Sequence, residues 1–437
     1  MIKIEKIQLN NFKFFTDDSI NNTFKPNKNG MLIYGENGSG KSSLFKAFDF
    51  LTKTDISEDE FNENINIFSS DDTYLEFDFS NDETLRIDED HLSLDNQFPF
   101  IEKLSISKPI IEYKDLLKVS FLEENKTKNL YPFFAKILEN YPIDDENTPL
   151  KSLRGQEYFD RYKSIIKDEL FDDINVFLDR FNHNIKIVDI TFDAFEKETF
   201  LEIEYFNEPI QKYNKFLNEA RLSALAISVY FAIIKKQFGL LGSDTLKILV
   251  LDDLLISLDM NNRLSLIDIL KEEFSDFQIF FFTHEKALFD LVNEKMNLQS
   301  YEIYVKQELD YEVPFVKNSN DLLTQAIYQK DTHNYGCSAN LLRQCTEKLL
   351  CKYLPKELQL DRRCKIVSLN TLLDKAKNFE ATKEDKDQDL VDIFDKLKTF
   401  KRVLLNEASH YNSSEIYKRE LEDVITTIES LQNKLVV

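Results

Sequence analysis

Glycine is concentrated in one short stretch of the chain, NGMLIYGENGSGKSSLFKAF, at residues 29–48. The chain has only eight glycines, and half of them fall here. The segment from Gly35 to Ser42 fits the pattern G-x-x-x-x-G-K-[ST]. Glycines let the backbone curl so that successive N–H groups face one concavity, and a helix that begins there adds positive dipole. The pattern predicts a nucleotide-binding loop in which Lys41 reaches the β- and γ-phosphates and Ser42 ligates Mg²⁺. The residues expected to contact the nucleotide are Gly35, Asn37, Gly38, Ser39, Gly40, Lys41, Ser42 and Ser43.

Two further stretches place polar side chains directly after apolar runs. Residues 246–253 read LKILVLDD, so Asp252 and Asp253 end a run typical of a buried strand. In a P-loop enzyme the first carboxylate holds Mg²⁺ through water and the second polarises the attacking water, and we assign Asp252 and Asp253 these roles. Residues 277–286, FQIFFFTHEK, contain another strand-like run with His284 at its end. Because an open α/β sheet places ligand-contacting residues at strand ends, we expect His284 in the same site.

An α/β framework is needed to bring these residues together. Residues 31–34 and the apolar runs before Asp253 and His284 are expected to be buried strands, and residues 42–50 a helix. No apolar run is long enough to span a bilayer, and the start of the chain lacks the apolar core of a signal sequence. We therefore expect an α/β protein located in the cytoplasm.

The charge of the chain is unevenly distributed. There are 78 acidic and 55 basic residues, and the net charge of −23 argues against binding to nucleic acid or an anionic membrane through the overall field. Residues 321–437 carry 19 residues of each sign, so the whole deficit lies before them. The same region holds all four cysteines without a CxxC pair, which predicts neither a disulfide framework nor a zinc site. The C-terminal region is therefore expected to be a separate module.

Residues 1 to about 310 resemble the ABC-type ATPases of the SMC and RecF group. The likeness rests on the opening KIEKIQLNNFKFF, the loop at Gly35, the run ILVLDD, a D-loop SLD that ends at Asp259, and a switch histidine, His284. The resemblance implies that Asp259 contributes to the nucleotide site. We assign no counterpart to the Q-loop glutamine of the group.

The signature motif of that group corresponds in place to FLNEARLSALAISVYFAI at residues 216–233. The group usually has serine followed by glycines, whereas this chain has Asn218 and Glu219 at the helix start. Asn218 can still donate to a phosphate oxygen, and the helix N-terminus still directs its dipole there. The group usually has glutamate at Asp253, and the shorter side chain predicts slow hydrolysis. If the family geometry carries over, the signature of one subunit closes over the ATP of another, so that ATP drives head-to-head dimerisation.

The resemblance implies an ABC-type head built from two lobes. SMC proteins insert hundreds of coiled-coil residues between the lobes, but here the corresponding segment is short and helix-like. Two antiparallel helices of that length would reach at most roughly 45 Å. The expected regions are 1–107, a head lobe with the P-loop; 108–182, a helical insertion; 183–318, a second head lobe; and 319–437, an all-α bundle.

The C-terminal region has apolar residues at the three- and four-residue spacings of amphipathic helices. The helices expected there are 321–329, 334–353, 369–377, 389–406 and 415–434. In NLLRQCTEKLL, Arg343 and Glu347 are four residues apart and share a helix face. In FKRVLLNEASHYN, His410 follows the end of a helix.

These features resemble the C-terminal domains of the PrrC and RloC anticodon nucleases, which fuse an ABC-type ATPase to a helical HEPN-like ribonuclease domain. The resemblance implies metal-independent RNA cleavage, with tRNA as substrate, that leaves a 2′,3′-cyclic phosphate. His410 would transfer protons, Arg343 would stabilise the phosphoryl charge, and Glu347 would orient its partners. The plainer interpretation is that Arg343 and Glu347 form a surface ion pair and that His410 caps a helix.

Three hypotheses remain open from the sequence. The first is an ATP-gated RNA-cleaving toxin of bacterial anti-phage defence, which binds ATP, Mg²⁺ and RNA, self-associates and contacts no membrane. The second is an ATPase scaffold whose helical region docks a separately encoded effector or responds to a phage-encoded trigger. The third is a RecF-like repair ATPase, ranked last because the C-terminal bundle has no role there.

Overall fold

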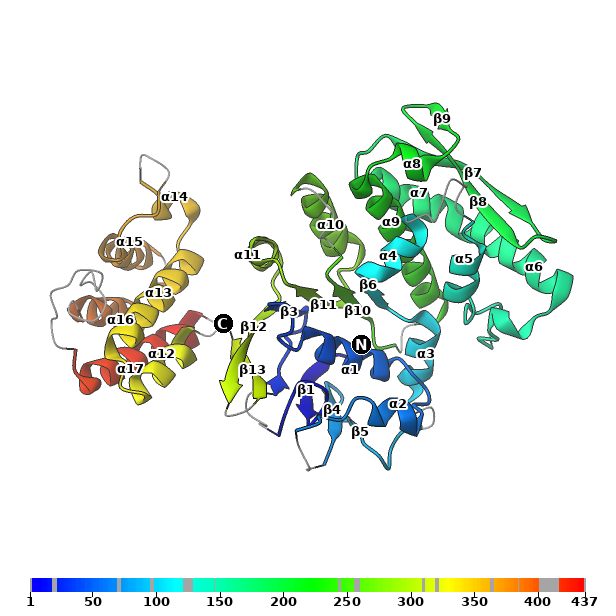
Figure 1. Ribbon diagram of the computed structural model, residues 1–437. Coiled ribbons are helices and arrows are strands. Elements are labelled where there is room, and N and C mark those ends of the chain that lie inside the picture. Colours follow the sequence, from blue (N-terminus) through cyan, green and yellow to red (C-terminus); the bar gives the residue numbers. More distant parts are fainter. Residues whose placement is uncertain are drawn as a thin grey trace. The chain divides into compact units, whose positions relative to one another are not determined.

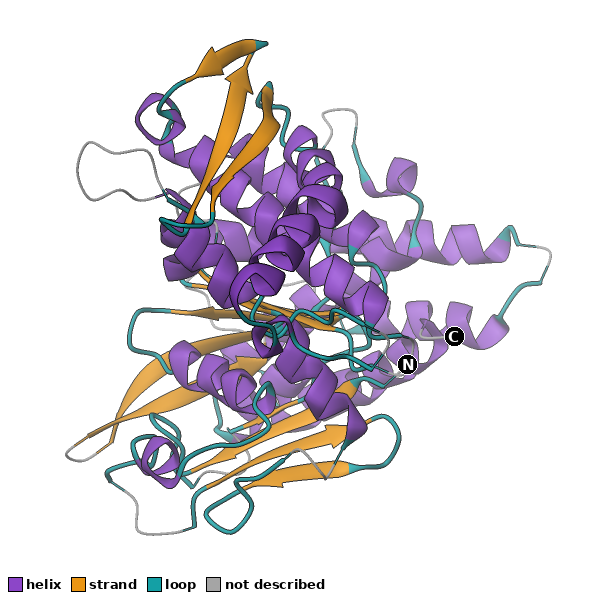
Figure 2. Cartoon of the chain, turned by 90° about the vertical axis from the view of Figure 1, so that its right-hand side faces the viewer, coloured by secondary structure: helices purple, strands orange, loops and turns teal. Residues whose placement is uncertain are grey.

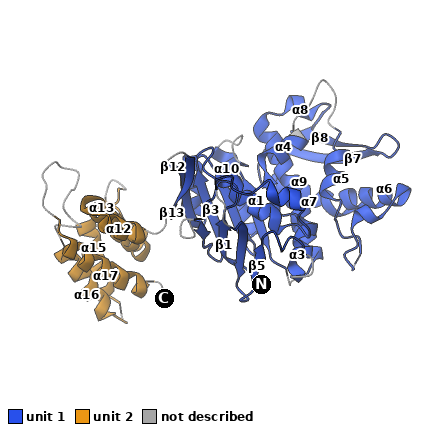
Figure 3. Cartoon of the chain, turned by 60° about the horizontal axis from the view of Figure 1, so that its bottom comes forward, with its two compact units in different colours: residues 1–317 blue, residues 318–437 orange. Residues whose placement is uncertain are grey.

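The chain forms two compact units in the computed structural model, residues 1–317 and 318–437, here called unit 1 and unit 2 (Figure 3). The described residues are 2–17, 22–68, 72–94, 98–120, 129–144, 146–242, 245–254, 260–308, 311–318, 322–361, 365–383, 385–400 and 416–435.

The centre of unit 1 is a largely parallel sheet. Among the described residues its strand order is β13–β12–β3–β11–β10–β6. The strands are β3 (Gly30–Gly35), β6 (Ile110–Glu112), β10 (Ile248–Asp252), β11 (Gln278–Thr283), β12 (Gln299–Glu308) and β13 (Tyr311–Asn318). The five strands from β12 to β6 run parallel to one another. The nearly continuous apolar runs of β3, β10 and β11 fit strands that are covered on both faces.

A second, antiparallel sheet has the order β2–β1–β4–β5 in the described part of unit 1. Its strands are β1 (Ile4–Asn10), β2 (Thr23–Phe24), β4 (Tyr74–Phe79) and β5 (Thr84–Ile87). Helix α1 (Lys41–Leu51) packs between the two sheets, since the Phe48 ring lies 6.1 Å from that of Phe77 in β4 and 4.4 Å from that of Phe280 in β11. The helix that follows the P-loop is therefore held by a buried aromatic core.

A helical lobe joins the head on the side of β6 (Figure 1). Its helical segments are α4 (Tyr113–Ser120), α5 (Tyr131–Ile137), the 3₁₀ turn η1 (Leu150–Ser152), α6 (Gly155–Ser164), the π-helical segment η2 (Ile165–Leu170) and α7 (Phe171–Asp179). The lobe also carries an antiparallel sheet (Figure 2), formed by β7 (Ile185–Asp193), β8 (Glu198–Tyr205) and β9 (Glu208–Ile210).

The segment expected to be a helical insertion, 108–182, differs from two antiparallel helices. It is divided into short helices, and its residues Ile110–Glu112 form β6, which pairs with β10 in the central sheet. A three-residue strand is too short to show a period of two in the sequence. The insertion is thus partly built into the head itself.

Helix α9 (Glu219–Leu240) is the long apolar helix that follows the signature region. Within the described residues it alone has the length and composition of a membrane-spanning helix, but 83% of its most apolar window is buried inside the protein, as in a core helix. The remaining helices of unit 1 are α2 (Glu58–Asn62), α3 (Pro99–Ser107), α8 (Tyr213–Phe216), α10 (Met260–Glu273) and α11 (Lys286–Lys295).

Unit 2 is built mainly from helices in its described part, with an isolated β-bridge between Leu360 and Ile366, and has a core of its own. Its helices are α12 (Leu322–Asp331), α13 (Tyr335–Tyr353), α14 (Lys356–Gln359), α15 (Leu369–Ala381), α16 (Gln388–Thr399) and α17 (Lys418–Leu435). Helix α13 packs against α12, α15 and α17. The expected helix 389–406 is observed as α16, which ends at Thr399; residues 401–415 lie outside the described residues. The expected fold class, an α/β P-loop head with a helical insertion followed by an all-α bundle, is confirmed.

Candidate nucleotide site

The loop between β3 and α1 has the backbone conformation that the glycine pattern requires. Gly38 and Gly40 have φ angles of 87° and 106°, in the left-handed region that favours glycine. A Cβ on Gly35 would lie 2.3 Å from Ser39 Oγ and 3.0 Å from Lys41 Cγ, so only glycine leaves room for the loop to close. The loop runs into the first turn of α1, where N–H groups have no partner within the helix.

Lys41 is buried within this loop. Its ammonium group donates to the carbonyl oxygens of Gly35 at 2.5 Å and Glu36 at 3.1 Å. Burial lowers the pKa of Lys41, while the nearby charges of Asp253 and Asp252 act in the opposite direction. The predicted phosphate-contacting charge therefore lies close to both carboxylates that were assigned from sequence.

Two hydroxyl groups of the loop differ in their surroundings. Ser39 Oγ is buried and has no hydrogen-bond partner among the described residues, as expected of a group that faces a ligand. Ser43 Oγ accepts from the backbone amide of Phe14 at 3.3 Å, which ties α1 to the N-terminal segment. Ser42, the predicted Mg²⁺ ligand, is exposed at the start of α1.

Asp252 is the last residue of β10 and lies opposite Phe282 of β11. Its Oδ1 atom is buried without a hydrogen-bond partner in the described structure. Burial raises the pKa of Asp252 to about 7, and the neighbouring Asp253 charge adds to the shift. A buried, unpaired carboxylate oxygen beside a phosphate-binding loop fits a group that binds a divalent cation directly or through water.

Asp253 and His284 lie at the ends of the neighbouring strands β10 and β11. The Asp253 backbone N–H donates to the carbonyl of Phe282 at 3.1 Å, which fixes the turn after β10. Asp253 Oδ1 accepts from the backbone N–H of His284 at 3.0 Å and lies 2.9 Å from His284 Nδ1. The structure thus brings the two predicted catalytic residues into direct contact.

Glu112 is a third carboxylate of this edge that sequence reasoning missed. It ends β6 and lies opposite Asp252 in the parallel pairing of β6 with β10. Its charge contributes to the raised pKa of Asp252. A longer apolar run that ended in charged residues would have predicted a site residue at this position. The three-residue strand IIE is too short to be recognised in the sequence.

The signature residues make contacts of their own. Asn218 caps α9, and its Oδ1 accepts from the backbone N–H of Arg221 at 3.0 Å, which leaves the side-chain NH₂ group free to donate elsewhere. Glu219 accepts from the Tyr113 hydroxyl at 3.0 Å, so the start of α9 is joined to the start of α4. Asp259 lies outside the described residues.

The candidate ribonuclease residues are described only in part. Arg343 and Glu347 form the expected ion pair on α13, with Nε 3.1 Å from Oε1, and their side chains are 30% and 36% exposed. Exposed pairs of this spacing contribute about 0.3–0.5 kcal/mol. His410 lies outside the described residues.

No protein-family model matches the chain, and no curated protein sequence matches it. The solved structures that are similar to it include three SMC heads of low sequence identity. An Smc head bound to the C-winged helix domain of ScpA has 13% identity and a TM-score of 0.47, covering 74% of this chain and 99% of its own. An Smc head with an extended coiled coil, bound to the C-terminal domain of ScpA and derived from Pyrococcus furiosus, has 14% identity and a TM-score of 0.46 over 74% and 98%. An SMC head domain from Thermotoga maritima has 13% identity and a TM-score of 0.40 over 71% and 98%.

Proposed function

We propose that unit 1 binds ATP with Mg²⁺ and hydrolyses it. The observation that carries this proposal is the set of residues gathered at the carboxyl ends of the strands of the central sheet. There the P-loop with its buried Lys41, the unpaired Oδ1 of Asp252, and the Asp253–His284 pair follow three adjacent parallel strands. Phosphoryl transfer depends mainly on positioning and electrostatic stabilisation, and each of these groups has a part in it.

The P-loop residues of this chain would bind the phosphates. The backbone N–H groups from Gly38 to Ser42 would surround the β- and γ-phosphates, and Lys41 would exchange its carbonyl contacts for phosphate oxygens. Ser42 and Asp252 would hold Mg²⁺, which supplies charge neutralisation at the phosphate oxygens when bound. Asp253 would orient the attacking water, and His284 would hold the Asp253 carboxylate in place.

Phosphate release from ATP by the purified chain tests this function. We expect slow, Mg²⁺-dependent release by the wild type, because the Asp253 carboxylate reaches less far than a glutamate would. Lys41→Ala should reduce release to the background rate. Release that continues unchanged in Lys41→Ala would show that a contaminant, or another site, is responsible.

Head-to-head dimerisation is part of the same proposal. The exposed Asn218 at the N-terminus of α9 has an NH₂ group that can donate to a phosphate held by a second copy. ATP with Mg²⁺ should therefore increase the mass seen by light scattering, and Asp253→Asn should trap the dimer. The proposed dimerisation would be contradicted if both the wild type and Asp253→Asn remain monomeric in the presence of ATP.

For unit 2 we propose, from the sequence, that it cleaves RNA, with tRNA as the substrate, in anti-phage defence. Binding and hydrolysis of ATP by unit 1 would control this cleavage. Support comes from the helical bundle and from Arg343 and Glu347 on α13. The alternative is a scaffold in which unit 2 docks a separate effector. Incubating the pure protein with total tRNA and ATP separates the two, because only the first predicts cleavage without an added protein.

A further inference from the structure

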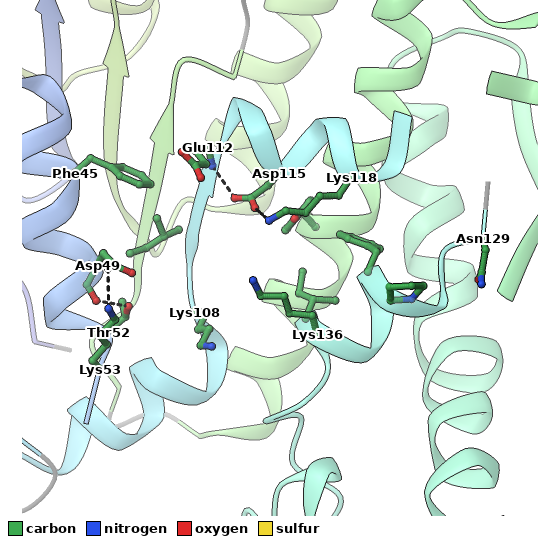
Figure 4. Close-up of a pocket in the computed structure, with 15 residues that line it drawn as sticks. Phe45, Asp49, Thr52, Lys53, Lys108, Glu112, Asp115, Lys118, Asn129 and Lys136 are labelled. Atoms are coloured by element: carbon green, nitrogen blue, oxygen red, sulfur yellow. Dashed lines mark hydrogen bonds and ion pairs between the residues drawn. The ribbon is translucent and has the colours of Figure 1, made fainter. Parts of the chain in front are cut away.

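A cavity of about 560 Å³ opens in unit 1 where α1, β6 and the helical lobe meet (Figure 4). Its volume lies within the range of small-molecule sites, about 300–1,000 Å³. The residues that line it are Phe45, Asp49, Thr52, Lys53, Lys108, Ile110, Glu112, Asp115, Lys118, Asn129, Pro132, Phe133, Lys136, Ile137 and Tyr230. These described lining residues include no member of the P-loop and none of Asp252, Asp253 and His284. The cavity adjoins the proposed nucleotide site at Glu112, which lies opposite Asp252 at the end of β6.

One side of the cavity is a rigid apolar wall. The rings of Phe133 in α5 and Tyr230 in α9 pack edge to face with centroids 5.3 Å apart. Their residues are only 7% and 6% exposed, so both rings are fixed by the core and present one edge or face to the cavity. Ile110 and Ile137 also line the cavity. Such a wall can contact a flat apolar group at little entropic cost.

The charged residues of the cavity favour an anion. Four lysines and three carboxylates line it, in a chain whose net charge is −23. Three of the lysines form ion pairs: Lys53 with Asp49 at 3.0 Å, Lys108 with Glu139 at 2.9 Å, and Lys118 with Asp115. Asp49 and Asp115 are thereby engaged, and Glu112 is the one lining carboxylate without an ion pair in the described structure.

Lys136 differs from the other three lysines. It makes no ion pair or hydrogen bond to the residues that the structure describes, and its ammonium end extends into the cavity (Figure 4). An ammonium group beside apolar rings, free to move to a ligand, can bind an anionic group without first breaking an existing ion pair.

We propose that this cavity binds a small organic anion, a carboxylate or a phosphate monoester carried on a flat apolar body. Lys136 contacts the anionic group, and Phe133 and Tyr230 contact the ring. An ammonium group has no fork geometry that separates carboxylate from phosphate, so both heads fit the same contact. The ligand would lie against α1, which begins at the P-loop, and against β6, which pairs with β10.

Binding is tested with phenyl phosphate and benzoate as probes, titrated into the full-length protein and followed by NMR of the ligand. Mg²⁺ and a non-hydrolysable ATP analogue are present to keep the probes from the P-loop. At least one probe should bind with a Kd below about 1 mM. Inorganic phosphate and phenol should each bind at least about tenfold more weakly, because each lacks one half of the contact. Binding of benzoate alone or phenyl phosphate alone identifies the head group.

Lys136→Glu should weaken the bound probe at least about tenfold, because it replaces the contacting ammonium with a like charge. Lys114→Glu is the matched control, since Lys114 is also exposed in the same lobe but does not line the cavity. If Lys136→Glu lowers the melting temperature, Lys136→Gln takes its place. The proposal is overturned if neither probe saturates, if Lys136→Glu binds as tightly as wild type, or if inorganic phosphate binds as well as the aromatic probes. Because these titrations measure binding alone, their outcome is independent of whether the protein hydrolyses ATP.

Discussion

The Asp253 carboxylate accepts the backbone N–H of His284 at 3.0 Å and lies 2.9 Å from its Nδ1 atom. When Asp253 is ionised its carboxylate can only accept, so a hydrogen bond in this pair then requires a proton on His284 Nδ1. Asp253 itself has a φ of 51°, a left-handed conformation that is uncommon outside glycine and asparagine or aspartate. Both backbone and side chain of Asp253 are therefore held by the strand end that carries His284.

This relationship predicts that Asp253 and His284 act as one unit in hydrolysis. Asp253→Asn should retain ATP binding and slow hydrolysis by about 10²–10⁴-fold, the usual contribution of a general base. His284→Ala should also slow hydrolysis, because the Asp253 carboxylate loses a side-chain partner that holds it in position. The double variant should be no slower than Asp253→Asn alone. Steady-state phosphate release measures all three.

A matched control for that cycle lies on the surface of unit 1. His91 Nδ1 lies 2.6 Å from Asp88 Oδ1, a histidine–aspartate pair of the same kind away from the P-loop. His91→Ala should leave hydrolysis unchanged. Fully multiplicative effects of Asp253→Asn and His284→Ala would mean that the two residues act independently.

The raised pKa of Asp252 predicts that the metal-free protein loses stability as pH rises. The folded state binds the proton more tightly than the unfolded chain, because the pKa is about 7 in the structure and about 3.9 when unfolded. The free energy of unfolding should therefore fall between about pH 4 and pH 7. Asp252→Asn should remove this loss and be more stable than wild type at pH 8 by on the order of 2–4 kcal/mol.

Chemical denaturation in EDTA at pH 5 and pH 8 measures this difference. The advantage of Asp252→Asn should shrink at pH 5, where the wild-type carboxyl is protonated in the folded state. Asp90→Asn serves as a control, since Asp90 is exposed. An equal stability of Asp252→Asn and wild type at both pH values would show that Asp252 is not a strained buried carboxylate.

Two glycine substitutions should have opposite effects. Gly35→Ala places a Cβ 2.3 Å from Ser39 Oγ and should abolish ATP binding by opening the loop. Gly239→Ala, inside α9, meets no atom within 4 Å and should raise the free energy of unfolding by about 0.5–1 kcal/mol. Nucleotide titration and thermal melting of both variants check the pair, and normal ATP affinity in Gly35→Ala would contradict the loop geometry.

The ribonuclease proposal predicts separate effects on the two units. His410→Ala and Arg343→Ala should each abolish RNA cleavage while ATP hydrolysis continues, because the nucleotide-site residues all belong to unit 1. Lys418→Ala is the control, since Lys418 and Glu422 form another pair of the same spacing, 4.0 Å apart on α17. Cleavage that persists in folded His410→Ala would remove His410 from catalysis. A wild type that never cleaves tRNA would favour the scaffold.

Local sequence patterns predicted those parts of the site that each lie within one short segment of the chain. The P-loop, the carboxylates after β10 and His284 each follow an apolar run long enough to be read as a strand, and the parallel sheet brings those strand ends together. The Arg343–Glu347 contact also follows from helix spacing alone.

Other residues come together only through strand pairing and the packing of distant helices, and the sequence did not predict their positions. Glu112 reaches Asp252 only because a three-residue strand pairs at the edge of the sheet. The cavity beside Lys136 combines α1, α5 and α9, which are far apart in the chain. The π-helical turn at Ile165–Leu170 continues the helix from α6 into α7 and leaves no break in the apolar pattern. Such features depend on long-range packing, which a single sequence does not show.

The most direct test of the nucleotide site is a calorimetric titration of the full chain with ATP and Mg²⁺, comparing wild type, Lys41→Ala and Lys46→Ala. Lys46 is in the same helix, but its ammonium pairs with Asp49 and Glu60 rather than with the loop. The structure predicts saturable binding in wild type and Lys46→Ala, and none in Lys41→Ala. Equal ATP affinity in Lys41→Ala and wild type would contradict the assignment of this loop as the nucleotide site.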